Sequence, residues 1–304
     1  MGSKGTKLVR LFDANQSDSN GNHTVFPNYG NVHTLALISS STYHAFQSTL
    51  RLQGWAGVSG FATYTWSKSI DDASDGIDFT AGAAFPQDST NLRAERAPST
   101  FDTRHRFTAA VNYRVPTVKA LPKKLGSGWE ANWIWSAQSG RPINIITSND
   151  TSNRFYFNQR PNIIPGVNPI QSNWTASTGY FNPLAFTQPQ PGTFGNLGRD
   201  AFYGPRYWNA DFSLDKQTQI TERLALQFRA ELFNIFNHPN LSLPNNTITP
   251  GFDENGVKVC DPAPSSGPPC RIGLITQTPD VAQGNPGLGG GGPRVIQLGL
   301  KLKF

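Results

Sequence analysis

The sequence predicts an all-β protein, an antiparallel transmembrane β-barrel or a large part of one. Three observations predict this fold. The last eleven residues alternate between apolar and polar side chains over the length that a tilted strand needs to cross a bilayer. Several other segments alternate in the same way. The connections between these segments are short at one end and long at the other, as in bacterial barrels.

The C-terminal segment, residues 294–304, is the clearest of these strands. Its apolar side chains share one face, which consists of Ile296, Leu298, Leu300, Leu302 and Phe304. Gly299, Leu302 and Phe304 resemble the terminal signal that the outer-membrane assembly machinery reads in bacterial β-barrels. Leu298 departs from that signal, which usually has a polar residue at this place. Taken alone, the segment also fits an amphipathic terminal strand of a soluble β-sandwich.

Composition excludes one class of membrane protein and agrees with a barrel. Hydrophobic residues make up 37% of the 304 residues, and the mean hydropathy is −0.42. No run of about 18 apolar residues occurs, which excludes membrane-spanning helices. A barrel needs no such run, because only alternate residues face lipid. The net charge of +6 is scattered without a Lys/Arg cluster, so it predicts no nucleic-acid partner and at most loose attraction to anionic lipid.

Seven segments alternate well enough to be predicted as strands. They are residues 43–52, 58–66, 106–115, 129–138, 207–215, 221–236 and 294–304. Residues 32–39 are a weaker eighth candidate. We therefore expect residues 1–42 to form a loop that can include a partial strand, and residues 43–304 to form barrel strands.

The segment 221–236 carries two conflicting signals. Leu224, Phe228, Leu232 and Phe236 lie at helical spacing, and the composition favours a helix. The same segment also alternates between apolar and polar residues. A strand precedes it across a short turn, so the neighbours favour a strand.

The aromatic residues and the connections suggest a direction for the strands. Long polar links cover about 67–105, 140–207 and 234–293, while the links between the other strands are short. With a periplasmic C-terminus, the short turns are periplasmic and the long loops extracellular. Aromatic residues then form girdles at both membrane edges: Tyr64, Trp66, Phe107, Trp208 and Phe233 at the outer edge and Trp129 at the inner edge. A sandwich with an aromatic core is the alternative.

Strand number indicates that more of the barrel lies upstream. Seven strands cannot close a bacterial barrel with an even strand count, and an open sheet in lipid leaves backbone groups without partners. The first residues also lack the apolar segment of a signal peptide. We therefore expect the chain to be the C-terminal part of a larger protein.

Several motifs together resemble a known family. YHAFQSTLRL, FATYTWSKSIDDASD, FDTRHRFTAAVNYRVP, GWEANWIWSAQSGRPINI and the long run ending in LFNIFNHPN occur in the order found in Oar-like TonB-dependent receptors of Acidobacteria and myxobacteria. The resemblance covers nearly all of residues 43–304. It implies the last seven or eight strands of a 22-stranded barrel with long extracellular loops.

The resemblance also implies partners and a function. Its partners are outer-membrane lipid and lipopolysaccharide, the barrel assembly machinery, an N-terminal plug and upstream strands, and TonB through that N-terminal part. The implied function is uptake of a bulky nutrient across the cell outer membrane of a Gram-negative bacterium. The alternatives are an adhesion or structural barrel without transport, and a soluble β-sandwich binding module.

Individual residues predict no enzyme, cofactor or metal site. The five histidines are far apart in sequence, and no nucleophile motif occurs. The acidic run around Asp71, Asp72, Asp75 and Asp78 lacks the spacing of a calcium loop, which favours a solvated loop.

Two further groups of residues carry predictions. Cys260 and Cys270 lie close together in a Pro-rich segment, which favours a local disulfide in an oxidising compartment. Polar residues on the strands predict lumen-facing charge ladders, consisting of Arg114, Glu130, Asp211, Arg229 and Glu231. These residues either contact a plug or substrate in the full protein or, as the default interpretation, pair structurally across the strands.

Overall fold

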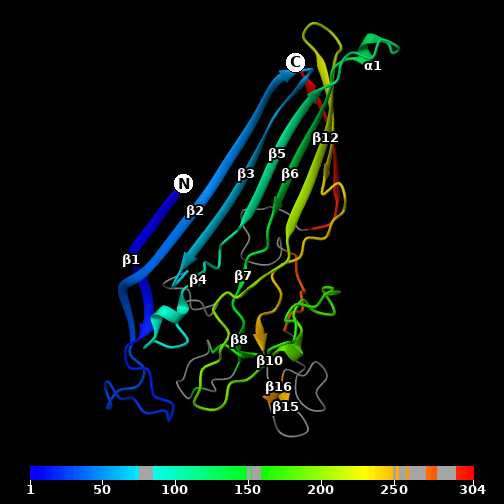
Figure 1. The fold of residues 1–304 in the computed structure, drawn as a ribbon. Coiled ribbons are helices and arrows are strands. Elements are labelled where there is room, and N and C mark those ends of the chain that lie inside the picture. Colours follow the sequence, from blue (N-terminus) through cyan, green and yellow to red (C-terminus); the bar gives the residue numbers. More distant parts are fainter. Residues whose placement is uncertain are drawn as a thin grey trace.

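The protein is nearly all β in a computed structural model that describes residues 1–74, 85–148, 152, 159–248, 251–252, 258–259, 272–278 and 292–304. Its main element is a nine-stranded antiparallel sheet with the order β1-β2-β3-β5-β6-β12-β13-β17, in which the short β4 also pairs with β3 (Figure 1). The strands are β1 Gly2–Asp13, β2 His33–Trp55, β3 Val58–Asp71, β4 Ala97–Pro98, β5 His105–Arg114, β6 Trp129–Gln138, β12 Tyr207–Gln219, β13 Ala225–Phe233 and β17 Val295–Lys303.

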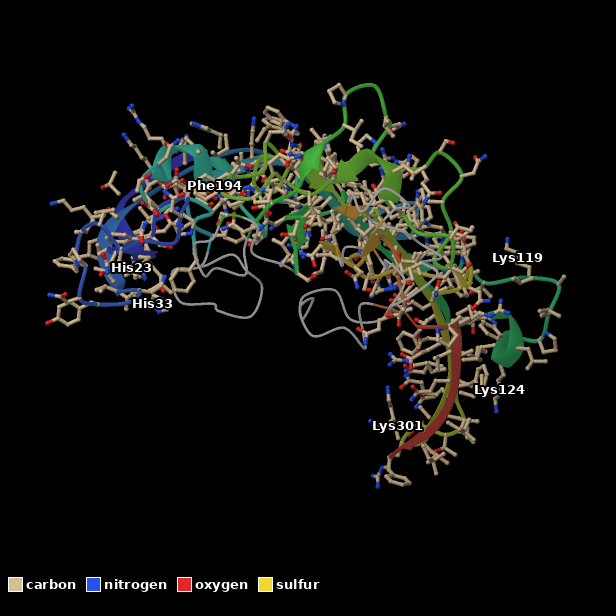
Figure 2. The ribbon with its side chains drawn as sticks, turned by 90° about the horizontal axis from the view of Figure 1, so that it is seen from below. His23, His33, Lys119, Lys124, Phe194 and Lys301 are labelled. Atoms are coloured by element: carbon tan, nitrogen blue, oxygen red, sulfur yellow. The ribbon has the colours of Figure 1, made fainter. Side chains whose placement is uncertain are left out.

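The sheet is curved and open. Seen along its strands, it forms an arc with β1 at one end and β17 at the other (Figure 2). All seven strands predicted from alternation are present, and the predicted antiparallel all-β class is confirmed. The ambiguous segment 221–236 contains β13, so the strand interpretation is confirmed. Pairing on both sides, with β12 and β17, overrides its helix propensity.

Strand pairing separates the side chains into two faces. One row of paired residues crosses five strands and is wholly apolar: Val111, Trp133, Phe212, Leu232 and Ile296. The adjacent row is wholly polar: Asn112, Asn132, Ser213, Glu231 and Gln297. On the apolar face of β17, Leu298 and Leu300 are 68% and 71% exposed. A continuous apolar surface of this kind suits contact with lipid.

Residues 1–42 contain more strand than the sequence predicts. β1 pairs with β2 from Gly2 to Asp13, and residues 32–39 belong mostly to the long β2 rather than to a separate strand. The alternation of β1 is hidden because its register shifts around Leu8, next to Lys7 with a φ of 55°. Such a bulge moves the following side chains to the opposite face.

The long polar links contain ordered elements. They contain short strands and turns of helix: η1 Leu92–Glu95, β7 Pro142–Ile143, β8 Ile146–Thr147, β9 Asn162–Ile163, η2 Pro183–Ala185, β10 Phe186–Thr187, β11 Phe202–Tyr203, β14 Thr247–Ile248, β15 Gly251–Phe252 and β16 Lys258–Val259. We call the described parts of residues 140–206 and 237–278 the loop module. It holds a buried core of Ile143, Ile145, Tyr180, Phe181, Ala185, Phe186, Leu197, Ile248, Ile272 and Ile275.

The loop module and the tight turns lie at opposite ends of the sheet. Figure 1 shows β7, β8, β10, β15 and β16 at one end, and α1 (Lys123–Gly126) with the C-terminus at the other. This arrangement follows the predicted division into long and short connections. Among the helices that the structure describes, none has the length and apolar character needed to cross a membrane.

Candidate functional site

A chain of hydrogen bonds crosses the polar face of the sheet between β5, β6 and β12. The Asn112 side-chain amide donates to Glu130 and, at 2.7 Å, to Asn132 Oδ1. Asn132 in turn donates to Ser213 Oγ and to Asp215 Oδ2, each at 3.1 Å. Asn112, Asn132 and Ser213 oppose one another in the strand register, and Glu130 and Asp215 lie two residues further along the same face, so all five side chains are within reach of one another.

Asp215 connects this chain to β13. Arg229 donates through Nε to Asp215 Oδ1 at 2.7 Å, and its Nη1 atom lies 3.5 Å from Glu231 Oε1. A cavity of about 600 Å³ lies along these residues and is also lined by the apolar side chains of Phe61 and Ile134. The polar face therefore offers both hydrogen-bonding groups and apolar contacts. We call the set Asn112, Glu130, Asn132, Asp215 and Arg229 the inner-face network.

The structure brings together only some of the residues predicted for the lumen face. Glu130, Arg229 and Glu231 belong to the inner-face network or contact it, and Arg114 opposes Glu130 in the register. Asp211 lies apart, where it accepts from the Asn234 backbone N–H at 2.9 Å and helps to end β13. Sequence reasoning did not select the central Asp215. Its place in the alternation of YWNADFSLD put it on the polar face, but only the register shows that it joins two neighbouring strands.

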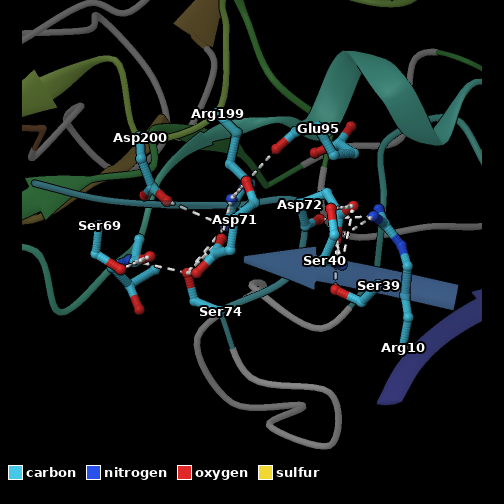
Figure 3. A network of polar contacts seen from close by, with 12 residues as sticks. Arg10, Ser39, Ser40, Ser69, Asp71, Asp72, Ser74, Glu95, Arg199 and Asp200 are labelled. Carbon is cyan, nitrogen blue, oxygen red and sulfur yellow. Dashed lines mark hydrogen bonds and ion pairs between the residues drawn. The ribbon is translucent and has the colours of Figure 1, made fainter. Parts of the chain in front are cut away.

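A second group of buried charges joins the loops to the sheet. We call it the anchor network: Arg10, Asp71, Asp72, Glu95, Arg160, Arg199 and Asp200. Figure 3 shows all of these residues except Arg160 with their labels. Arg160 binds Glu95 through two hydrogen bonds. Arg160 Nη1 donates to Glu95 Oε2 at 2.8 Å, and Arg160 Nη2 donates to Glu95 Oε1 at 2.9 Å. Arg199 pairs with Asp71 and donates through Nε to the Glu95 carbonyl oxygen at 2.8 Å. These bonds connect the loop module to β3 and to η1.

The remaining members attach β1 and β2 to the same place. Arg10 donates through NH1 to the Asp72 carbonyl oxygen at 2.6 Å, and the Ser39 hydroxyl donates to the Asp72 carboxylate (Figure 3). Asp71 and Asp72 are therefore used in binding arginine and serine. No cluster of three or more His, Cys, Asp or Glu side chains suited to a metal occurs within the described ranges.

Asp200 is the one strained member of the anchor network. Asp200 is 1% exposed and has a φ of 51°. Its Oδ2 atom lies 3.2 Å from Arg199 Nη1. Neither carboxylate oxygen accepts a hydrogen bond in the described part of the chain. Burial raises the pKa of Asp200 to about 6, although the charge of Arg199 opposes this shift. Asp75 and Asp78, from the same acidic run as Asp71, lie outside the described residues.

The aromatic residues proposed as girdles lie at both ends of the strands. Tyr64 opposes Phe107, and Trp66 opposes His105, on the apolar face toward the loop module. Trp208 stacks on His238 with ring centroids 4.3 Å apart.

The other two girdle residues have different settings. At the opposite end of the strands, Lys216 Nζ lies 5.5 Å from the centre of the Trp129 ring. Phe233 differs from its proposed role, because its pairing with Val295 continues the register of Glu231 with Gln297 and places it on the polar face. The position of Phe233 in the alternation of β13, rather than its aromatic character, decides which face of the sheet it lies on.

The terminal residues and the cysteines complete the predicted set. Gly299, Leu302 and Phe304 lie on or just beyond β17 at the edge of the sheet, and Phe304 is 95% exposed. A Cβ atom at Gly299 would meet nothing within 4 Å. Cys260 and Cys270 lie outside the described residues, so their disulfide stays a prediction.

Comparison with protein families agrees with this architecture. A family model described as an outer membrane beta barrel domain matches residues 1–297. Among solved structures, the outer membrane transporter YddB from Escherichia coli is similar at 9% sequence identity with a TM-score of 0.42. The match covers 90% of this chain and 28% of that transporter, so the chain spans little more than a quarter of its length. No match was found among curated proteins.

Proposed function

The chain belongs to the outer membrane β-barrel domain family, and from this membership we propose that it forms part of the wall of a transporter that takes up a bulky nutrient. The family places the chain in the outer membrane. It is a barrel family rather than an enzyme class, and the proposed action is gated passage without bond chemistry. The proposal goes further and assigns the chain to the Oar-like TonB-dependent receptors.

The observation that carries this proposal is the polar, concave face of the sheet with a folded module at one end. The inner-face network supplies amide, carboxylate and guanidinium groups along a cavity of about 600 Å³. Such a surface can exchange hydrogen bonds with a polar solute, while the apolar face contacts lipid. The loop module lies at one end of the sheet (Figure 1), and we propose that this end is extracellular and is where the solute enters.

The open edges of the sheet support a larger assembly. Within the described residues, β1 and β17 each pair on one side only, and free edges are costly in lipid. We propose that upstream strands of a 22-stranded barrel pair with these edges and that a plug occupies the lumen and contacts TonB. The barrel assembly machinery and lipopolysaccharide complete the proposed partners.

Uptake is tested in cells of the native host. Accumulation of radiolabelled iron chelates, oligosaccharides and peptides is compared in wild-type cells, in cells lacking the gene, and in cells lacking TonB. The proposal expects one class of solute whose accumulation falls equally in both deletions. The inner-face double variant Asp215→Asn/Arg229→Gln is expected to lower that uptake, while Leu298→Val on the apolar face serves as the matched control.

The folded loop module favours adhesion as a second candidate function. Its own core and the buried ion pairs of the anchor network hold a fixed surface at one end of the sheet. A barrel of this kind can bind a surface without moving a solute. Unchanged uptake of all three classes, together with reduced attachment of cells lacking the gene, would replace transport by adhesion.

A further inference from the structure

The turn between β5 and β6 has a defined fold that the proposed transport does not use. We call residues 115–128 the inner-rim turn. Val118 donates its backbone N–H to the Gly126 carbonyl oxygen at 2.9 Å, and Leu125 donates to that of Pro122 at 2.8 Å. A Cβ atom at Gly126 would lie 2.5 Å from the Val118 oxygen, so this close approach requires glycine.

The inner-rim turn folds toward the apolar face of the sheet. Trp129, which shares that face with Trp133, donates through Nε1 to the Leu125 carbonyl oxygen at 2.8 Å. Lys216, which opposes Trp129, donates to the carbonyl oxygen of Ser127. Figure 2 agrees, since it shows α1 with Lys119 and Lys124 on the side of the sheet away from Lys301.

The exposed residues of the inner-rim turn are of two kinds. Val118, Leu121 and Leu125 are 43%, 49% and 60% exposed, and the lysines at 119 and 124 are exposed as well. The sequence of the turn contains three lysines and no Asp or Glu. An apolar group beside a purely basic group is typical of segments that lie in a membrane interface.

The length of the strands places this turn at the membrane surface. β5 and β6 contain 10 residues each, which is about the length that crosses the hydrocarbon core. The turn begins directly after β5 and continues the apolar face beyond it. Its side chains therefore reach the depth of the lipid head groups, where a lysine gains from contact with a negative phosphate.

We propose that the inner-rim turn binds anionic phospholipid of the inner leaflet, with Lys119 and Lys124 on the head-group phosphate and Val118, Leu121 and Leu125 inserted beside the acyl chains. The site anchors the turn of β5 and β6 at a fixed depth. It depends on the chain's placement in the outer membrane and stands whether or not the barrel imports a nutrient.

The test measures lipid binding to the folded full chain in neutral detergent by native mass spectrometry. Dioleoyl phosphatidylglycerol and dioleoyl phosphatidylcholine are titrated separately, and folding of each variant is checked by its heat-modifiable migration on gels. We expect a clear preference for phosphatidylglycerol in the wild type. That preference falls by about fivefold for each of Lys119→Gln and Lys124→Gln, because each lysine near the surface contributes about this factor.

Three further variants separate the site from net charge and from simple hydrophobicity. Lys301→Gln/Lys303→Gln removes two charges, as many as Lys119→Gln and Lys124→Gln together, at the same end of the sheet but on the polar face, and it should leave the preference unchanged. Lys119→Arg/Lys124→Arg should retain the preference. Leu121→Asn/Leu125→Asn should weaken binding of both lipids.

Two results would show that the inner-rim turn is not a site for anionic phospholipid. Equal binding of the two lipids by the wild type would do so, as would an equal loss in the Lys301→Gln/Lys303→Gln control. Unchanged binding of both lipids by the Leu121→Asn/Leu125→Asn variant would contradict the insertion of the apolar side chains beside the acyl chains.

Discussion

Arg160 and Glu95 form a buried, doubly hydrogen-bonded ion pair although 65 residues separate them in the sequence. Their side chains are only 5% and 2% exposed. The pair joins the loop module to η1, and Arg199 extends the connection to Asp71 at the end of β3. Charge pairing thus joins the loop module to the end of the sheet.

Glu95→Gln should strongly destabilise the loop module. The substitution preserves shape but leaves the Arg160 charge buried without its partner, which costs about 3–5 kcal/mol. Hydrogen exchange of backbone amides in residues 159–200 would measure this loss of stability.

The double variant Glu95→Met/Arg160→Met is the control for this prediction. It removes both charges, so its cost should be clearly smaller than that of Glu95→Gln. Equal protection of the wild type and Glu95→Gln would show that the pair does not hold the loop module.

Asp200→Asn should stabilise the loop module at neutral pH. The native pKa of about 6 exceeds the ordinary value of 3.8, so the native state binds more protons than the unfolded state between these pH values. Stability from this residue is present below pH 4 and is lost as pH rises through about 6. The loss at pH 7 is about 3 kcal/mol, which the uncharged Asn avoids.

The measurement compares proteolysis of the loop module in wild type and Asp200→Asn from pH 4 to pH 8. Asn also tolerates the positive φ of this position, whereas Asp200→Ala adds backbone strain and serves as the contrasting variant. The stability difference between wild type and Asp200→Asn should grow with pH. A difference that does not change with pH would contradict the raised pKa.

Deletion of Phe304 should reduce the amount of folded protein in the outer membrane. The side chain is 95% exposed, so its removal costs little packing within the chain. A loss of assembly would therefore report recognition by the assembly machinery. The amount of heat-modifiable protein in isolated outer membranes is the readout, with Phe304→Trp as the aromatic control. Normal assembly after the deletion would contradict a role of Phe304 as an assembly signal.

Gly128→Ala should lower the stability of the turn between β5 and β6. Gly128 has a φ of 78°, and a Cβ atom there would lie 2.3 Å from the Gln217 carbonyl oxygen on β12. Gly54→Ala, at a φ of 65° with nothing within 4 Å, carries only backbone strain of about 1–2 kcal/mol. The urea midpoint in detergent should fall further for Gly128→Ala, and equal midpoints would mean that the contact relaxes.

Alternation was sufficient to predict the sheet wherever the register is regular. β17 and β6 show it plainly, because side chains on neighbouring positions point to opposite faces. β1 escaped the prediction because the bulge near Lys7 breaks the two-residue period. Phe233 was predicted as part of the outer aromatic girdle, and strand parity puts it on the polar face.

The loops show the limit of sequence reasoning most clearly. Composition identified residues 140–207 as a long polar connection, but it did not reveal the core around Phe181 and Ile145. Nor did any pattern connect Glu95 with Arg160 or Asp71 with Arg199, which is 128 residues away. Contacts between residues so far apart leave no periodic pattern in the sequence.

By itself, the sequence determined seven strands of the main sheet and their two faces, because both depend on neighbouring residues along one strand. It also determined the alternation of short and long connections, because these are the segments that lie between the strands. Only the tertiary structure decided which polar groups meet, such as Asp215 with Arg229 across two strands. It also decided that the inner-rim turn folds onto the apolar face. These features depend on how strands and distant segments pack against one another, and the residue pattern along a single strand does not show which residues then meet.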